Sequence, residues 1–178
     1  FVDSTKGWQS IQDSTTAVSG TTFVCASGGT VLTVGDFKTH VFTGSGTFTV
    51  NSVATNAPSN NVDYLVVAGG ASGGRGRGGG GGAGGFRTFS SAPGNNSPLS
   101  APNGTPVSAQ GYPITIGAGG AVTNTGTPAS GNSGTNSIFS AIISAGGGGG
   151  SAAAPGDAKA GGSGGGVGYT GPGSPGSA

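Results

Sequence analysis

Apolar runs of this chain lead three times directly into tracts dominated by glycine. The three junctions read VVAGGASGG, ITIGAGG and IISAGGGGG, and glycine supplies 43 of the 178 residues. Ordering a glycine tract costs on the order of 1–2 kcal/mol of backbone entropy per residue, so an ordered tract must pack against another tract, against strands or against another subunit. Runs of glycine can form extended threefold helices, like polyproline II, that lie side by side and hydrogen-bond through their backbones. A solvated linker is the alternative, above all for the last tract.

The first tract also contains the pattern G-x-G-x-x-G, at Gly74, Gly76 and Gly79. A dinucleotide-binding loop needs a helix directly after these glycines and an acidic residue about twenty positions later. Here GGGAGGF follows, which cannot form a helix, and the next acidic residue is Asp157. No Gly-Lys pair is present for a P-loop, and two arginines in the tract are too few for an RNA-binding segment. We therefore expect glycine to serve packing here.

The composition predicts an all-β fold. Met and Glu are absent and there are three Leu, so good helix formers are scarce, whereas Val, Ile, Thr, Phe and Tyr favour strands. Six Lys and Arg against five Asp give a net charge of +1. This balance argues against nucleic acid and anionic membranes as partners. No run of 18 apolar residues and no signal-peptide pattern is found, so we expect no membrane insertion.

Residues 21–50 contain three strand-like runs. They read TTFVCAS, TVLTVGDFKTHVFT with a break or bulge at Gly35, and TFTVNSV. In the second run, the alternation predicts that Phe37, Thr39 and Val41 face inward and that Lys38 and His40 face outward. The tight TGSG turn predicts that the second and third runs form a hairpin.

The later runs complete the predicted sandwich. NVDYLVVAGG is apolar on both faces and is expected to be a central, covered strand. GFRTFS is a short strand anchored by Phe86, and GYPITIGAGG turns Tyr112, Ile114 and Ile116 inward. The expected core consists of Phe23, Val41, Phe48, Tyr64, Val66, Ile114, Ile116, Phe139 and Ile143.

Residues that carry chemistry are scarce and scattered. His40 is the single histidine and is interpreted as a surface residue, while Cys25, with apolar flanks, is interpreted as a buried structural cysteine. A zinc site needs more ligands than these two, and the five Asp form no calcium-loop pattern. No G-x-S-x-G elbow lies between a strand and a helix. We therefore expect no catalytic residues, no metal and no cofactor.

Two asparagines are candidate N-glycan acceptors. Asn95 lies in NNS and Asn103 in NGT, both within a Pro- and Ser-rich loop that we expect to be exposed. Chance occurrence is the alternative, because Asn, Ser and Thr are common in this chain.

The order of strands and tracts carries a resemblance. It runs DFKTHVFTGSGTFTV, VDYLVVAGG, GGGGAGGFRT, YPITIGAGG, NSIFSAIISAGGGGG. Over residues 36–150 the chain resembles the glycine-rich domain of bacteriophage tail-fibre and other structural proteins, and VDSTKGWQSIQDST resembles the segment that precedes it there. The order is also similar to the glycine-rich extracellular domain of anaplastic-lymphoma-kinase-type receptors. Both resemblances imply a jelly-roll-like β-sandwich with polyglycine helices, and neither implies catalytic residues.

These observations suggest three regions and two functions. The regions are an extended arm over 1–20, a glycine-rich sandwich over 21–150 and a Gly/Ala/Ser/Pro-rich tail over 151–178. We expect a non-enzymatic structural subunit of an extracellular filament or fibre. The alternative is a phage tail-fibre adhesin that binds a host surface glycan or protein. Either function places the protein outside the cell or on the virion surface.

The arm is the expected assembly element. It is polar and has well-spaced apolar anchors at Phe1, Val2, Trp8 and Ile11. Addition of this arm as a strand to the next copy gives head-to-tail polymers, because two different patches meet and the contact does not close. The alternative is that the segment forms the first strand of its own sandwich.

Overall fold

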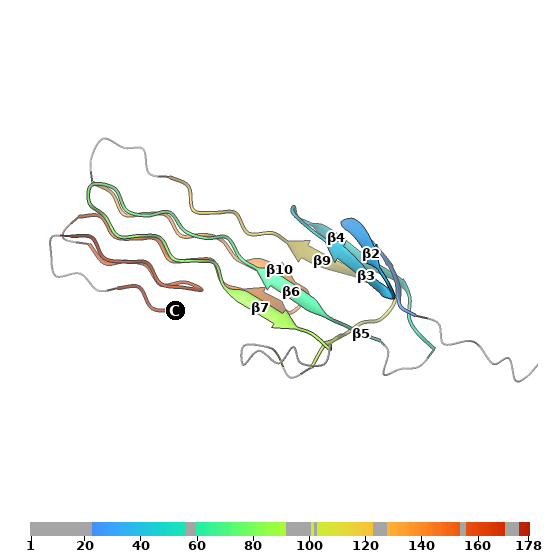
Figure 1. The fold of residues 1–178 in the computed structure, drawn as a ribbon. Helices are drawn as coiled ribbons and strands as arrows, with labels where there is room; N and C mark the ends of the chain where they lie inside the picture. Colours follow the sequence, from blue (N-terminus) through green and yellow to red (C-terminus); the bar gives the residue numbers. More distant parts are fainter. Residues whose placement is uncertain are drawn as a thin grey trace, which may run out of the picture.

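The computed structural model describes residues 23–55, 60–91, 101, 103–122, 128–153, 156–169 and 175–178, and within them it is all-β with no helix. Figure 1 shows an elongated molecule with its strands gathered at one end and long wavy segments running side by side at the other. The strands are β1 (Cys25–Ser27), β2 (Thr30–Val34), β3 (Phe37–Val41), β4 (Gly46–Ser52), β5 (Asn61–Val62), β6 (Tyr64–Val67), β7 (Phe86–Phe89), β8 (Thr105–Pro106), β9 (Gly111–Thr115), β10 (Ser137–Phe139) and β11 (Ile142–Ser144).

The strands form one larger sheet and three ribbons, all antiparallel. The larger sheet has the order β1-β4-β9-β10-β11, and the ribbons are β2-β3, β5-β8 and β6-β7. The expected all-β class is confirmed. Among the described residues the sheets form no closed barrel, and they do not show a jelly roll.

The pairing of the early strands differs from the predicted hairpin. β3 pairs with β2, while β4 pairs with β1 and β9. Val34 lies opposite Phe37, so Gly35 and Asp36 form a two-residue turn in which Gly35 has a φ of 57°. Glycine at the first central position with positive φ is what a type II′ hairpin turn uses. The break at Gly35 is therefore a full reversal of the chain.

Phe139 of β10 lies at the centre of the core. Its ring lies 6.1 Å from Phe48, 6.3 Å from Tyr112 and 6.5 Å from Tyr64, measured between ring centroids. Edge-to-face pairs at these distances are favourable. Of the predicted core residues, three are buried, namely Phe48, Val66 and Phe139. Three more are partly buried, namely Tyr64, Ile114 and Ile116.

Three predicted core residues are exposed instead. Phe23 is 80% exposed, Ile143 53% and Val41 38%. Neighbouring residues of a strand face opposite sides, and in β11 Ile142 packs against the core, which turns Ile143 outward. Val41 lies on the outer side of the β2–β3 ribbon, and Phe23 precedes the edge strand β1.

The strand β6 is not a covered central strand. It pairs with β7 alone, and this ribbon packs against β10 and β11 with one face. The other face is open, so Leu65 is 60% exposed and Val67 53%. Phe86, expected to be an anchor, lies opposite Val67 on the same open face and is 50% exposed.

His40 and Cys25 have exchanged their expected environments. His40 is partly buried: its Nδ1 lies 2.8 Å from the Gly28 carbonyl oxygen, and its ring meets Phe48 edge-on at 5.1 Å. Cys25 is an exposed free thiol, because the adjacent Val24 and Ala26 are the residues of this segment that pack against the core. Strand alternation therefore holds for β1, but in the opposite phase to the predicted one.

Tyr112 is held by a local hydrogen-bond network. The Ser108 amide donates to the Tyr112 Oη at 2.7 Å, and the Ser108 hydroxyl lies 3.3 Å from the same oxygen. The Ser108 hydroxyl and amide lower the pKa of the Tyr112 phenol below its ordinary value, because donors stabilise the phenolate. The inward orientation predicted for Tyr112 is confirmed.

Candidate functional site

The glycine tracts are joined by main-chain hydrogen bonds that repeat every third residue. In the segment 68–75, one set of amides donates to 79–85 at 2.8–3.0 Å, and the next set donates to 129–135 at 2.8–3.1 Å. The first set pairs Ala68, Ala71 and Gly74 with Gly85, Gly82 and Gly79; the second pairs Gly69, Ser72 and Arg75 with Thr135, Asn132 and Ala129. Each segment thus turns successive residues toward different neighbours. We call this arrangement, made of the described residues in 68–85, 117–122, 128–136, 145–153, 156–169 and 175–178, the tract bundle (Figure 1).

The segment 146–151 lies at the centre of the tract bundle. All six residues are buried. Gly147 and Gly150 donate to the segment 69–72, and Gly148 and Ser151 donate to 163–166. Its carbonyls accept amides from 79–82, 131–134 and 159–162. The described residues beyond 150 are therefore hydrogen-bonded members of the tract bundle.

None of the five central glycines, 146–150, has room for a side chain. A methyl group on any of the five would overlap a backbone carbonyl of a neighbouring segment. The obstructing carbonyls belong to Gly134 for Gly146, Gly82 for Gly147, Lys159 for Gly148, Gly131 for Gly149 and Gly79 for Gly150. Glycine is needed here for close approach of backbones, not for a special backbone conformation.

Two glycines of the G-x-G-x-x-G pattern have the same purpose. A methyl group on Gly74 would overlap the Ser151 carbonyl, and one on Gly79 would overlap the Gly166 carbonyl. The Gly74 amide donates to the Gly79 carbonyl at 2.8 Å, which closes the reversal around Arg75–Arg77, where Gly76 has a φ of 72°. The prediction that glycine serves packing in this tract is confirmed for Gly74 and Gly79, whereas Gly76 serves the reversal.

Polar side chains at the same threefold spacing complete the centre of the tract bundle. Ser130 and Ser133 accept the amides of Ala152 and Gly149 through Oγ at 3.2 and 3.3 Å. Asn136 accepts the Gly146 amide through Oδ1 at 2.9 Å. These three acceptors satisfy two amides of the buried segment and the amide of the adjacent Ala152.

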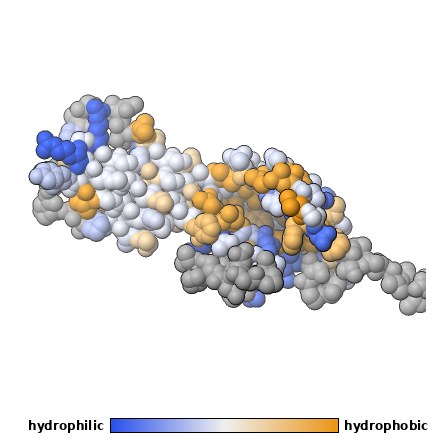
Figure 2. All heavy atoms as spheres, in the orientation of Figure 1, coloured by the Kyte–Doolittle hydropathy of each residue, from blue (hydrophilic) through white to orange (hydrophobic). Residues whose placement is uncertain are grey.

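The end of the tract bundle remote from the strands gathers larger side chains. There the reversal Arg75–Arg77 includes Arg77 with a φ of 61°, and Tyr169 donates its amide to the Arg77 carbonyl at 3.0 Å. Tyr169 is 78% exposed. Figure 2 shows strongly hydrophilic atoms at this end, beside a long stretch of weakly coloured atoms. Arg75, Arg77 and Tyr169 thus bring exposed charged and aromatic side chains to this end of the tract bundle.

Two apolar surfaces lie over the strand half of the molecule, where Figure 2 shows the most hydrophobic atoms. The first is the outer face of the β2–β3 ribbon and the second is the open face of β6–β7. The exposed residues are Leu32, Val34, Phe37 and Val41 on the first and Leu65, Val67 and Phe86 on the second. Exposed apolar surfaces of this kind mark contact sites more often than scattered single residues do.

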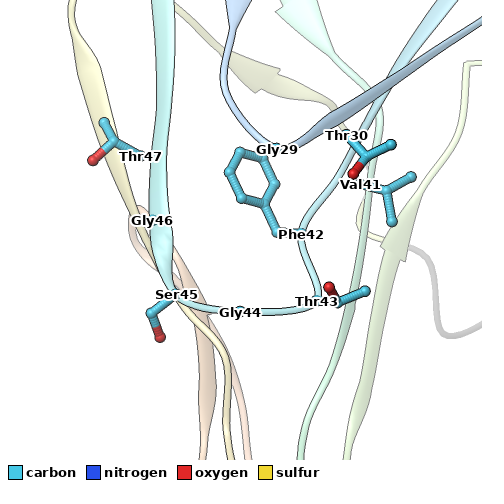
Figure 3. A pocket seen from close by; sticks show the side chains of 9 residues that line it. All are labelled: Gly29, Thr30, Val41, Phe42, Thr43, Gly44, Ser45, Gly46 and Thr47. Carbon is cyan, nitrogen blue, oxygen red and sulfur yellow. The ribbon is translucent and has the colours of Figure 1, made fainter.

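The turn between β3 and β4 borders a cavity of 240 Å³ (Figure 3). Its lining consists of Gly29, Thr30 and residues 41–47, and no titratable side chain is among them. Within the described ranges, no three His, Cys, Asp or Glu residues gather where they could hold a metal ion. The described part likewise has no helix long and apolar enough to cross a membrane.

The predicted site residues lie mostly outside the described part of the chain. This holds for Phe1, Val2, Trp8, Ile11 and Asn95. Asn103 is described and is exposed just before β8, so its side chain is accessible to modification. The outer apolar face of β2–β3 was not predicted from the sequence. A two-residue turn at Gly35–Asp36 would have placed its four apolar residues on one side.

Comparison with known families agrees with this architecture. The family described as a glycine-rich domain matches residues 43–178. The chain belongs to this glycine-rich domain family. The glycine-rich domain comprises β4 to β11 and the whole tract bundle, while β1, β2 and β3 precede the matched range. No curated protein and no solved structure matches the chain significantly.

Proposed function

We propose that this protein is a structural subunit of an extracellular or virion-surface filament or fibre, assembled by head-to-tail contacts between copies. The tract bundle carries the proposal. It is an elongated body whose segments are joined to their neighbours by repeated main-chain hydrogen bonds (Figure 1). Such a body suits a mechanical role, because many short hydrogen bonds share a load along its length. Its sides offer few side chains for chemistry.

We further infer that the tracts are threefold extended helices of the polyglycine type. Hydrogen bonds that return to the same neighbour every third residue support this inference, since such a helix has three residues per turn. The jelly-roll-like arrangement implied by the resemblance stays a prediction. An experimental structure should give backbone dihedral angles of roughly φ −75° and ψ +145° over residues 146–151, which are the ideal values of this helix.

Assembly through the arm is the testable core of the proposal. The full chain should form filaments as its concentration rises, which sedimentation velocity and negative-stain electron microscopy would detect. Deletion of residues 1–12, or Trp8→Ala, should leave folded monomers, because the anchors Phe1, Val2, Trp8 and Ile11 are lost wholly or in part. Thermal unfolding of the variants checks that they stay folded. Normal filaments from the deleted chain would refute assembly through the arm.

A second candidate is an adhesin that binds a host surface glycan or protein. The exposed Tyr169, bonded through its backbone to Arg77 at the end of the tract bundle, favours it. Aromatic and arginine side chains are enriched among residues that dominate binding energy. Binding of the full chain to a glycan array and to intact host cells should fall at least about tenfold in Tyr169→Ala. Phe23→Ala, which removes an aromatic ring that is 80% exposed at the strand end, is the matched control. Equal binding by both variants would argue against this candidate.

A further inference from the structure

The β2–β3 ribbon is folded with its apolar face outward. In antiparallel pairs, directly opposite residues share a face, and alternate residues along a strand share it too. The register Thr30↔Val41, Leu32↔Thr39 and Val34↔Phe37 therefore places all the members of these pairs on one side. On that side Phe37 is 72% exposed, Val34 76%, Leu32 51% and Val41 38%.

The opposite face of the ribbon contacts the rest of the molecule through His40, its one partly buried residue. It carries the pairs Val31↔His40 and Thr33↔Lys38, and Val31 is 45% exposed while Thr33 and Lys38 are exposed too. His40 reaches the Gly28 carbonyl at 2.8 Å and packs edge-on against Phe48 of the core. Turning the apolar face inward would require a register shift that breaks both contacts. The contacts of His40 therefore fix which face of the ribbon is turned outward, and Leu32, Val34, Phe37 and Val41 lie on that face.

The ribbon also offers unpaired strand edges. Among the described residues, each of its two strands has one hydrogen-bonded neighbour within its sheet, which leaves an edge on both sides. Open edges beside apolar surface are sites where another extended segment adds to a sheet. A segment that docks here would gain main-chain hydrogen bonds and cover the apolar face together.

The remainder of the chain contains one segment with enough apolar side chains to be the occupant. Outside the described residues the large apolar residues are Leu99 and five in the first 22 positions, namely Phe1, Val2, Trp8, Ile11 and Val18. Residues 1–22 can span up to about 73 Å when extended, far more than the roughly 17 Å of a five-residue strand. When extended, the stretch from Phe1 to Ile11 alone is longer than one ribbon strand. This reach suits a segment that extends from one copy to the next.

We propose that the outer face of β2–β3 is the acceptor for residues 1–22 of a neighbouring copy. This inference rests on the proposed filament and names the surface that receives the arm. Phe37, Val34, Leu32 and Val41 form the apolar floor, and Trp8 is the largest side chain placed on it. Each copy contributes an arm at one contact and a ribbon at another, so the contact repeats without closing.

Trp8 fluorescence in the full chain provides the test, because it is the single tryptophan of the protein. As concentration rises, the emission should shift to the blue and become protected from acrylamide in parallel with assembly. Phe37→Asp should raise the midpoint concentration of this change at least about tenfold, a change equivalent to about 1.4 kcal/mol. Val122→Asp is the matched control, because Val122 is 74% exposed in the tract bundle, and its midpoint should equal that of the unaltered chain.

The other outcomes are equally decisive. Protection of Trp8 at every concentration would mean that the arm covers its own ribbon and would overturn the inference. Filaments that assemble without a change at Trp8, or whose midpoint Phe37→Asp leaves unchanged, would overturn it while the filament proposal stands. Dimers or short oligomers that protect Trp8 and depend on Phe37, without filaments, would support the acceptor surface and refute the filament.

Discussion

At the scale of single residues, the fold depends on where a Cβ atom has no room. Gly150 lies in the buried central segment, and a methyl group there would meet the Gly79 carbonyl. Gly80, one residue from that carbonyl, is exposed and has no heavy atom within 4 Å of the position of a Cβ. Adjacent glycines thus differ completely in what they tolerate, because successive residues of a tract face different surroundings.

This contrast gives the first prediction. Gly150→Ala should lower the free energy of unfolding by about 3 kcal/mol, the upper range for forcing a methyl group into a packed interior. Gly80→Ala should leave it unchanged or raise it by about 0.5 kcal/mol, because alanine restricts the unfolded chain. Urea denaturation of both variants measures the difference. Equal midpoints would mean that the tracts do not pack as described.

The hydroxyl of Tyr112 gives the second prediction. Tyr112→Phe keeps the ring contact with Phe139 but leaves the Ser108 amide without its acceptor. The free energy of unfolding should fall by about 1 kcal/mol, as for loss of a typical hydrogen bond. Tyr169→Phe is the control, since Tyr169 is 78% exposed and should unfold like the unaltered protein. A larger loss in Tyr169→Phe would contradict this assignment.

At the scale of elements, the tract 128–136 does more than fill a place in the tract bundle. Its side chains at Ser130, Ser133 and Asn136 accept amides of the central segment and of the adjacent Ala152, and its backbone bonds the tracts on either side. This mixture explains why it is less rich in glycine than the segment it contacts. A tract at the periphery can carry side chains wherever the threefold spacing points them toward an unpaired amide.

The third prediction follows from this spacing. Asn136→Ala removes the Oδ1 that lies 2.9 Å from the buried Gly146 amide, so the free energy of unfolding should fall by about 1–2 kcal/mol. Asn51→Ala is the matched control, because the Asn51 side chain is exposed and its contact to Ser27 is long, at 3.4 Å. Comparison of the two thermal midpoints suffices. A drop confined to Asn51→Ala would be inconsistent with the role of Asn136.

At the scale of the whole molecule, the strands and the tract bundle are continuous. β6, β9 and β11 run directly into glycine tracts, and other tracts lead back into β7 and β10 (Figure 1). The segments after residue 156 add a further layer that covers the central segment from the other side. The last part of the chain therefore contributes to stability even though it contains no strand in its described residues.

The fourth prediction tests this layer. Removal of residues 156–178 deprives Gly148 and Ser151 of their acceptors in 163–166 and exposes the buried glycines. The truncated chain should unfold at a clearly lower temperature, and amides of residues 146–151 should exchange with deuterium faster. Removal of residues 1–12 should leave both quantities unchanged in the monomer. If the C-terminal truncation is neutral, the layer does not protect the centre of the tract bundle.

The sequence by itself determined the all-β class and the use of glycine for packing. Both follow from local properties: the helix formers Leu, Met and Glu are scarce or absent, and glycine allows backbones to approach closely. The alternation of residues in GYPITIGAGG also predicted that Tyr112 faces inward, as the structure shows.

The tertiary structure alone decided which side of β2–β3, β6 and β11 is covered. Alternation separates two faces, but only a partner distant in sequence, such as Phe48 for His40, selects the inner one. The same holds for the tract bundle, where the Gly69 amide meets the Thr135 carbonyl across 66 positions. Because the glycines of a tract are all alike, they do not specify which tracts lie beside it. The strands at the ends of the tract decide its neighbours.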